Sequence, residues 1–553
     1  MNRPAELIIH NAHVHTVDQD RPRAEALAVR DGRISWVGDG GQWREHAGPD
    51  TQLVDAGGKL LLPGFVDSHN HVRLGSDAAC VQLAGAATLA EIGRRIEEWL
   101  RGNPGALWVE AEAFDYSAIP GGRMPTAADL DPFTGDHPAF VLSYDVHTAW
   151  LNTAALRRLG ITAASTELPY GTVQKDPASG EPTGFLTDFA TRGLSRDGHR
   201  ALRAAGLPWA DPDRQYGRLC ASLDLAARYG ITTVVEPQNS LDDLALFERA
   251  GAEGRLRSRI VAALFHPRGT SAADLAEFAE AARRFGSDRF RVGPLKLYID
   301  DVVEPHTAAL LEPYAGHHSH RGETFYPPEE FAQVLARLDA AGFQAFVHAT
   351  GDRGIRTVLD AVEHARRVNG PRDARHQVVH VECLDPADVP RFAELGVVAC
   401  MQPRHCSPDI AGPGRDWAEA VGEQRWSKAW PMRSLERAGA VLAFSSDWNV
   451  AEMDPLVGVY TAVTRQGLAG GPAWMPEETV DLAGALRGYT MGSAYANFLD
   501  DRLGSLTVGK HADLVLLSQD LFADDLAAKD PRAILDTRVE LGIVGGEVVH
   551  RAG

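Results

Sequence analysis

Two histidines one residue apart, His69 and His71, follow an apolar run and an aspartate. If residues 61–66 form a buried strand, both imidazoles leave its carboxyl end on the same side, because side chains alternate along a strand. Two imidazoles at that spacing can bind one divalent metal ion, with bonds of about 2.0–2.1 Å. The chain has 21 histidines and three His-x-His tripeptides, so the motif is a hypothesis that needs further ligands.

Four more residues of metal-binding types lie in later apolar runs. His348 and His380 each end such a run, and Asp447 follows another. Singly, each histidine is more often a hydrogen-bonded core residue, and the aspartate can be a helix N-cap. Lys296 lies between two leucines, where an unpaired ammonium is costly. It is either a snorkelling or ion-paired lysine, or one of lowered pKa that reacts with CO₂ to give an anionic carbamate ligand.

The strands that must position these residues appear as apolar runs separated by helical patterns. After 61–66 they are 231–236, 259–265, 294–299, 343–348, 377–381, 396–400 and 440–445. Such alternation indicates a parallel sheet covered on both sides. Eight units predict an α/β fold of the (β/α)₈ TIM-like barrel type, with its active site at the carboxyl ends of the strands. A doubly wound open sheet is the alternative, but no G-x-G-x-x-G follows a strand.

The rest of the chain divides around this barrel, predicted for residues 61–499. Residues 76–210 are too many for one connection and predict an inserted subdomain after the first strand. Short strands and glycine turns in 1–60 and 500–553 predict a small composite β-sandwich domain built from both termini. Large aromatic residues in the insertion either pack its own core or wall a substrate pocket. They are Trp99, Trp108, Phe114, Tyr116, Tyr144 and Trp150.

Composition excludes some classes of partner and favours one compartment. A net charge of −20 argues against nucleic acid and anionic membrane as partners, because both require basic surfaces. The five cysteines are odd in number and widely spaced, which predicts reduced thiols. No signal-peptide core and no apolar stretch of about 18 residues appear. We therefore expect a cytoplasmic protein.

The order His-x-His, Lys, His, His, Asp on strands one, four, five, six and eight resembles the ligand pattern of the amidohydrolase superfamily. The chain is most similar to the family 3 branch, which contains N-substituted formamide deformylase. The segments that carry the resemblance are 63–71, 347–353, 401–403, 446–447 and 504–514, together with 145–152 and 182–185 of the insertion. One departure is Trp448, which follows Asp447 where a small residue is commoner, so the substrate preference of the branch need not carry over.

The resemblance implies a two-metal hydrolase. Its ligands would be His69, His71 and Asp447 for one ion and His348 and His380 for the other, bridged by N-carboxylated Lys296. Two Zn²⁺ ions are expected, and Mn²⁺, Co²⁺ or Fe²⁺ also suit such ligands. A metal-bridging hydroxide would attack the carbonyl of an N-substituted amide or formamide and break its C–N bond. Asp447 would act as base and then as acid.

The remaining expectations concern the substrate and competing functions. His147 and Arg404 are the candidates for stabilising the oxyanion, whereas Glu382 is expected to have a supporting role. The aromatic insertion predicts a partly apolar small-molecule amide, and a homodimer is a family-level expectation. A mononuclear deaminase or cyclic amide or imide hydrolase is the alternative on the same fold. Its relatives usually carry a glutamate three residues after a strand-end histidine, and neither His348 nor His380 has one. A non-catalytic scaffold would have lost ligands, and none is missing.

Overall fold

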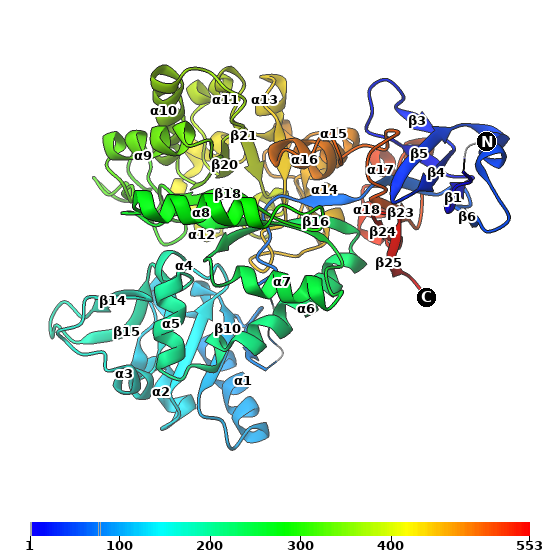
Figure 1. Cartoon of the computed structure of the whole chain (residues 1–553). Helices are drawn as coiled ribbons and strands as arrows, with labels where there is room; N and C mark the ends of the chain where they lie inside the picture. Colours follow the sequence, from blue (N-terminus) through cyan, green and yellow to red (C-terminus); the bar gives the residue numbers. More distant parts are fainter. Residues whose placement is uncertain (1–2, 76, 78) are drawn as a thin grey trace. The chain divides into compact units, whose positions relative to one another are not determined.

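The computed structural model describes residues 3–75, 77 and 79–553 (Figure 1). The described chain divides into two compact units. The first comprises Met1–Asn70, Leu223–Pro237 and Gly251–Gly553, and the second His71–Ser222 and Gln238–Ala250. The predicted domain limits stay a prediction, and residue 76, the predicted start of the insertion, lies outside the described residues.

The first unit contains a parallel eight-stranded sheet. Its order is β22-β21-β20-β19-β18-β17-β16-β8. The strands are β8 (Phe65–Asp67), β16 (Ile231–Asn239), β17 (Arg259–Phe265), β18 (Phe290–Tyr298), β19 (Ala345–Ala349), β20 (Gln377–His380), β21 (Val398–Met401) and β22 (Leu442–Phe444). The two edge strands meet where Ser68 N donates to Phe444 O at 3.3 Å, so the sheet is nearly closed. The predicted TIM-like barrel is confirmed.

Helices cover the outside of this barrel (Figure 1). They include α8 (Ala272–Arg284), α9 (Pro328–Ala340), α10 (Asp352–Asn369), α11 (Val389–Leu395) and α13 (Met432–Arg437). Helix α10 shows how the sequence specifies this layer, because Ile355, Val358, Leu359 and Val362 recur at helical spacing and are all buried. The polar strand-end residues are therefore held by a packed two-layer scaffold.

The first apolar run is divided between two sheets, which corrects the expectation of a single strand over 61–66. β7 (Leu60–Pro63) pairs with β23 (Leu514–Leu517) in an end sheet, and β8 pairs with β16 in the barrel. Gly64 lies at the division. A Cβ built there would be 2.2 Å from the side chain of Thr232, so the two strands approach too closely for any side chain.

We expect Gly64→Ala to destabilise the protein. The added methyl group must displace Thr232, a stiff β-branched residue in β16, and overpacking of this kind costs about 1–3 kcal/mol. Denaturant unfolding measures the change. Gly217→Ala in α6 (Pro212–Arg228) is the matched control, because its Cβ would meet no atom within 4 Å and helix propensity favours alanine by about 1 kcal/mol. Equal stabilities for the two variants would contradict the close-approach account.

Strands from both ends of the chain form the additional β domain. One sheet has the order β5-β4-β1-β6 and the other β25-β24-β23-β7-β2-β3. The remaining strands are β1 (Leu7–His10), β2 (His13–His15), β3 (Arg23–Ala24), β4 (Ala26–Arg30), β5 (Arg33–Gly38), β6 (Gln52–Asp55), β24 (Val539–Val544) and β25 (Glu547–Arg551). Ile9, Leu27, Leu514 and Ile543 share one buried cluster, so N-terminal and C-terminal strands pack on each other.

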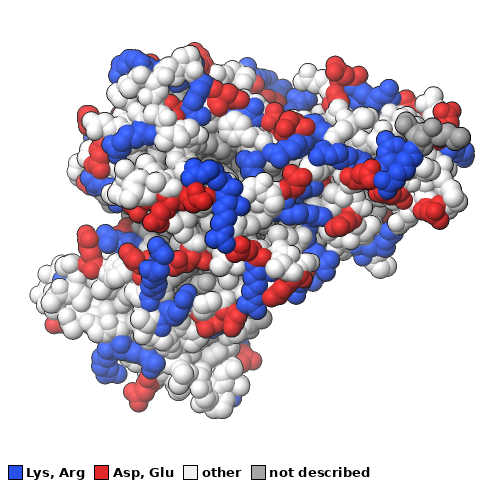
Figure 2. Space-filling model, in the orientation of Figure 1, with Lys and Arg blue, Asp and Glu red and all other residues white. Residues whose placement is uncertain are grey.

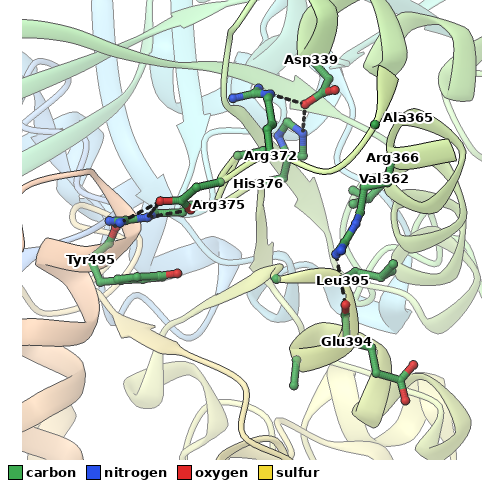
Figure 3. A pocket seen from close by; sticks show the side chains of 15 residues that line it. Asp339, Val362, Ala365, Arg366, Arg372, Arg375, His376, Glu394, Leu395 and Tyr495 are labelled. Carbon is green, nitrogen blue, oxygen red and sulfur yellow. Dashed lines mark hydrogen bonds and ion pairs between the residues drawn. The ribbon is translucent and has the colours of Figure 1, made fainter. Parts of the chain in front are cut away.

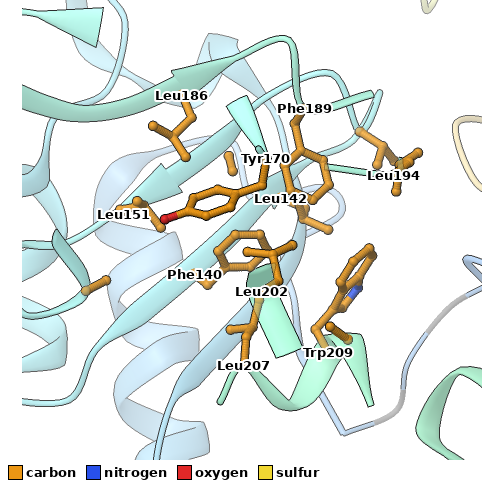
Figure 4. Packing of buried hydrophobic residues seen from close by; sticks show 14 of the residues in the cluster. Phe140, Leu142, Leu151, Tyr170, Leu186, Phe189, Leu194, Leu202, Leu207 and Trp209 are labelled. Carbon is orange, nitrogen blue, oxygen red and sulfur yellow. The ribbon is translucent and has the colours of Figure 1, made fainter. Parts of the chain in front are cut away.

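The second unit has its own sheet and its own core. The sheet order is β13-β14-β15-β12-β11-β10-β9. Its strands are β9 (Val81–Gln82), β10 (Val109–Phe114), β11 (Ala139–Ser143), β12 (Ala149–Leu151), β13 (Glu167–Leu168), β14 (Gly171–Lys175) and β15 (Pro182–Thr187). Figure 4 shows Phe140, Phe189 and Trp209 packed with leucines in one cluster. Trp108 belongs to this cluster, and Phe114 and Trp150 lie in a second, with Trp99 and Tyr116 against it. These aromatic rings therefore pack the unit's own cores.

Other properties of the described chain bear on partners. No helix in the described ranges combines the length and the hydropathy needed to cross a membrane. All five cysteines are buried and free. Acidic and basic side chains are interspersed over the face drawn in Figure 2. The predicted exclusion of nucleic acid and the cytoplasmic location stay predictions.

Candidate metal centre

Buried side chains of metal-binding types gather at the carboxyl ends of the barrel strands. His69, His71 and Asp447 offer ligand atoms that lie within 4.8 Å of one another. His69 Nε2 is 3.3 Å from Asp447 Oδ1. Two ligands of a tetrahedral ion lie about 3.4 Å apart when each is about 2.1 Å from it. This separation and the donor types fit one divalent metal ion.

Asp447 is held against His69 by hydrogen bonds between the two edge strands. The Asp67 carboxylate accepts hydrogen bonds from Ser446 N at 3.0 Å and from Ser446 Oγ at 2.6 Å. Asp447 N donates to His69 O at 2.8 Å. Asp447 has a positive φ of 57°, a conformation that costs a non-glycine residue about 1–3 kcal/mol. Burial raises the pKa of Asp67 to about 6, although Ser446 and Asn70 oppose that shift by donating to it.

His348 and His380, at the ends of β19 and β20, lie with ring centroids 4.4 Å apart. His380 Nδ1 is 2.9 Å from Gln402 Oε1, and Gln402 Nε2 donates to Ser445 Oγ, which fixes the amide orientation. His348 Nε2 is 3.1 Å from the backbone oxygen of Asp301. Because both oxygens only accept, these two nitrogens carry the protons. A metal ion would therefore bind through His380 Nε2 and His348 Nδ1.

Lys296 lies in β18 and is 1% exposed. Its Nζ is 4.8 Å from the ring centroid of Tyr298 and 5.2 Å from that of Phe346, and it has no ion pair with any described residue. Burial lowers the pKa of Lys296 to about 7, although the nearby Asp447 carboxylate opposes the shift. A large share of the amine is therefore neutral near pH 7, which is the form that can react with CO₂.

The two oxyanion candidates differ in their surroundings. Arg404 is buried, and its Nε donates to Glu452 Oε2 at 2.8 Å and its Nη1 to Asp409 Oδ1 at 2.8 Å. His147 lies in the second unit, in the turn between β11 and β12, where its backbone N donates to Asp145 Oδ1. Both roles stay predictions. Because Arg404 is already paired with two carboxylates, it is the weaker candidate for stabilising an oxyanion.

A second group of ligand-type residues contains one that the sequence argument did not single out. His380, Glu382 and His405 are buried, and their ligand atoms lie within 4.8 Å of one another. His405 follows β21, two residues after the segment 401–403 that carries part of the family resemblance. The available signal was a histidine just beyond the seventh barrel strand. This signal is weak, because His405 stands outside any apolar run.

A separate pocket lies at the other ends of the strands (Figure 3). Its volume is about 270 Å³, and its lining includes residues just before the start of β20 and β21. Arg372 Nε donates to Asp339 and Arg375 Nε to Asp373, so these guanidinium groups are already paired. The amino ends of the strands lie on this side, away from His69, His71 and Asp447. Active sites of such barrels lie at the carboxyl ends of the strands. The pocket is therefore not the candidate active site.

Comparison with known proteins gives one family and several relatives. A family profile described as an amidohydrolase family matches residues 52–550. The Arabidopsis thaliana protein LONG AFTER FAR-RED 3 is 29% identical over 544 residues, which cover 95% of this chain and 89% of that protein. The N-substituted formamide deformylase of Arthrobacter pascens is 30% identical over 532 residues, covering 94% of each chain.

A solved structure supports the fold. It is that of an uncharacterized metal-dependent hydrolase from Pyrococcus horikoshii OT3, with a TM-score of 0.71 and 21% identity. The alignment covers 93% of this chain and 97% of that chain. At this level of identity the likeness shows a shared fold, and the chemistry must be argued from the site.

Proposed function

The chain belongs to the amidohydrolase family, and we propose that it is a metal-dependent hydrolase that breaks the C–N bond of an N-substituted amide or formamide. The observation that carries this proposal is the buried group His69, His71 and Asp447 at the carboxyl ends of barrel strands. The likeness to an N-substituted formamide deformylase supports the substrate class. A partly apolar small molecule, a homodimer and a cytoplasmic location complete the proposal.

The ligands are assigned to two ions. His69, His71 and Asp447 would hold the first, and His348 and His380 would contribute to the second, with N-carboxylated Lys296 between them. Zinc is the proposed metal, because imidazole and carboxylate ligands suit it. Bound divalent ions would polarise the substrate carbonyl and lower the pKa of a water molecule toward neutrality.

Asp447 is the proposed general base and acid. Its Oδ1 faces His69, and its Oδ2 lies 3.9 Å from His380 Nδ1 and 3.8 Å from His405 Nε2. A carboxylate surrounded by imidazoles in a buried site can accept a proton from the attacking water and return it to the leaving nitrogen. Water adds to the carbonyl carbon, the C–N bond breaks, and an N-formyl amine gives formate and the free amine. His147 is retained as the proposed oxyanion donor.

A substrate panel with chelation tests this function. N-formyl and N-acyl amines, cyclic amides and imides, and nucleobases are assayed with protein purified without chelator. We expect release of formate or another carboxylate from the open-chain amides, loss of activity after metal removal, and recovery with Zn²⁺. Ammonia release from nucleobases, or ring opening of a cyclic substrate, with no open-chain amide hydrolysis would instead establish the alternative function.

A further inference from the structure

We propose that Glu382 and His405, together with His380, bind the second metal ion. This inference rests on the proposed function, because it concerns the ligands of the same centre. The three side chains are buried and offer ligand atoms within 4.8 Å of one another. Two imidazole nitrogens and one carboxylate oxygen suit zinc or a similar ion. The ligand pattern that the sequence suggested contains neither Glu382 nor His405.

One imidazole nitrogen of His405 is available to bind a metal. His405 Nε2 is buried and makes no hydrogen bond to any described residue. A buried polar nitrogen without a partner is costly, and a bound metal ion would satisfy it. His405 Nε2 lies 3.8 Å from Asp447 Oδ2, which places this nitrogen beside the first group.

Glu382 is a buried carboxylate in need of a cation. Trp417 Nε1 donates to Glu382 Oε2 at 2.9 Å, and within the described ranges no lysine or arginine forms an ion pair with Glu382. One indole N–H compensates little of the cost of burying a negative charge. A divalent ion shared with His380 and His405 would stabilise the ionised form of this carboxylate.

The backbone at the end of β20 is strained where these ligands begin. His380 has a φ of 81° and Val381 a φ of 50°, and a β-branched residue with positive φ is a genuine outlier. Glu382 O then accepts a hydrogen bond from Trp430 N at 2.8 Å, which fixes the turn. Strain of this kind persists where the surrounding structure imposes it, and it is concentrated at functional sites. Here it accompanies the placement of His380 and Glu382 next to His405.

Metal binding without substrate tests the assignment. Metal content by plasma mass spectrometry and Zn²⁺ affinity by competition with a chelating dye are measured for His405→Gln and Glu382→Gln. We expect each purified variant to contain about one ion fewer per chain than the parent. In the competition assay its second Zn²⁺ should bind at least about tenfold more weakly. Glutamine keeps much of the side-chain volume, and circular dichroism with thermal unfolding checks that each variant folds.

His266→Gln is the matched control. His266 is also a buried histidine that directly follows a barrel strand, but it belongs to neither ligand group. It should keep the metal content and affinity of the parent protein. His348→Gln is the decisive comparison: if folded His405→Gln and Glu382→Gln retain both ions with unchanged affinity while His348→Gln loses one, the assignment is overturned. Because the readout is metal alone, a failed amide screen would refute the proposed substrate and leave this assignment to be judged separately.

Discussion

Asp447→Asn should lower kcat for amide hydrolysis by about 10²–10⁴-fold, the usual contribution of a positioned general acid and base. The variant keeps an oxygen that can face His69, now 3.3 Å from Asp447 Oδ1, so part of the first metal site survives. The amide cannot accept a proton from water and return it to the leaving nitrogen. Steady-state kinetics at saturating Zn²⁺, with metal content measured on the same samples, separates lost proton transfer from lost metal.

An aspartate outside the centre provides the control. Asp274 accepts a hydrogen bond from Ser271 in the capping box of α8, so Asp274→Asn makes the same chemical change at a helix terminus. We expect its kcat to equal that of the parent and its stability to fall by about 0.3–1 kcal/mol, because a negative charge is lost near a helix N-terminus. If Asp447→Asn kept kcat within about threefold at equal metal content, Asp447 would not be the proton-transferring residue.

The barrel could be predicted because its strands are apolar and its helices periodic. Helix α10 shows this directly, since its buried residues recur at helical spacing. The division of the first run at Gly64 was missed because it depends on contact with Thr232, which lies far along the chain. Local patterns carry no information about such long-range approaches. The start of β18 was also misplaced. The strand begins at Phe290 and not at the expected residue 294, because Arg291 interrupts the apolar pattern by which the strand was recognised.

Candidate site residues can be predicted where a polar group interrupts an apolar strand. Lys296 and His348 stand out in that way, and the structure places both in buried strands. His405 carries no such signal, because it follows its strand and its proximity to Glu382 arises only in the folded chain. Arg404 shows the opposite limit: it follows a family motif in the sequence, but its pairing with Glu452 and Asp409 depends on the folded chain.

Lys296→Met should both lower kcat strongly and stabilise the metal-free protein. Methionine fills a similar volume beside Tyr298 and Phe346 but offers neither a charge nor an amine for CO₂. Without the bridging ligand we expect weaker metal binding and kcat lower by at least about 10²-fold. Replacing a buried charged group by an apolar one often stabilises a protein, by about 1–4 kcal/mol. Metal analysis, kinetics and denaturant unfolding of the metal-free protein measure the three effects.

Lower activity combined with higher stability is expected only if the buried Lys296 amine serves the metal centre. A lysine needed only for packing would give a less stable variant with metal content unchanged, since methionine alters the fit of the chain without touching the ligands. Lys428→Met is the comparison, because Lys428 Nζ donates to Asp352 and Asp385 at 2.8 and 3.0 Å. Removing a paired lysine leaves a buried carboxylate without its cation, so this variant should lose stability while keeping its metal. If Lys296→Met instead bound metal and turned over substrate like the parent, the bridging carbamate would have to be abandoned.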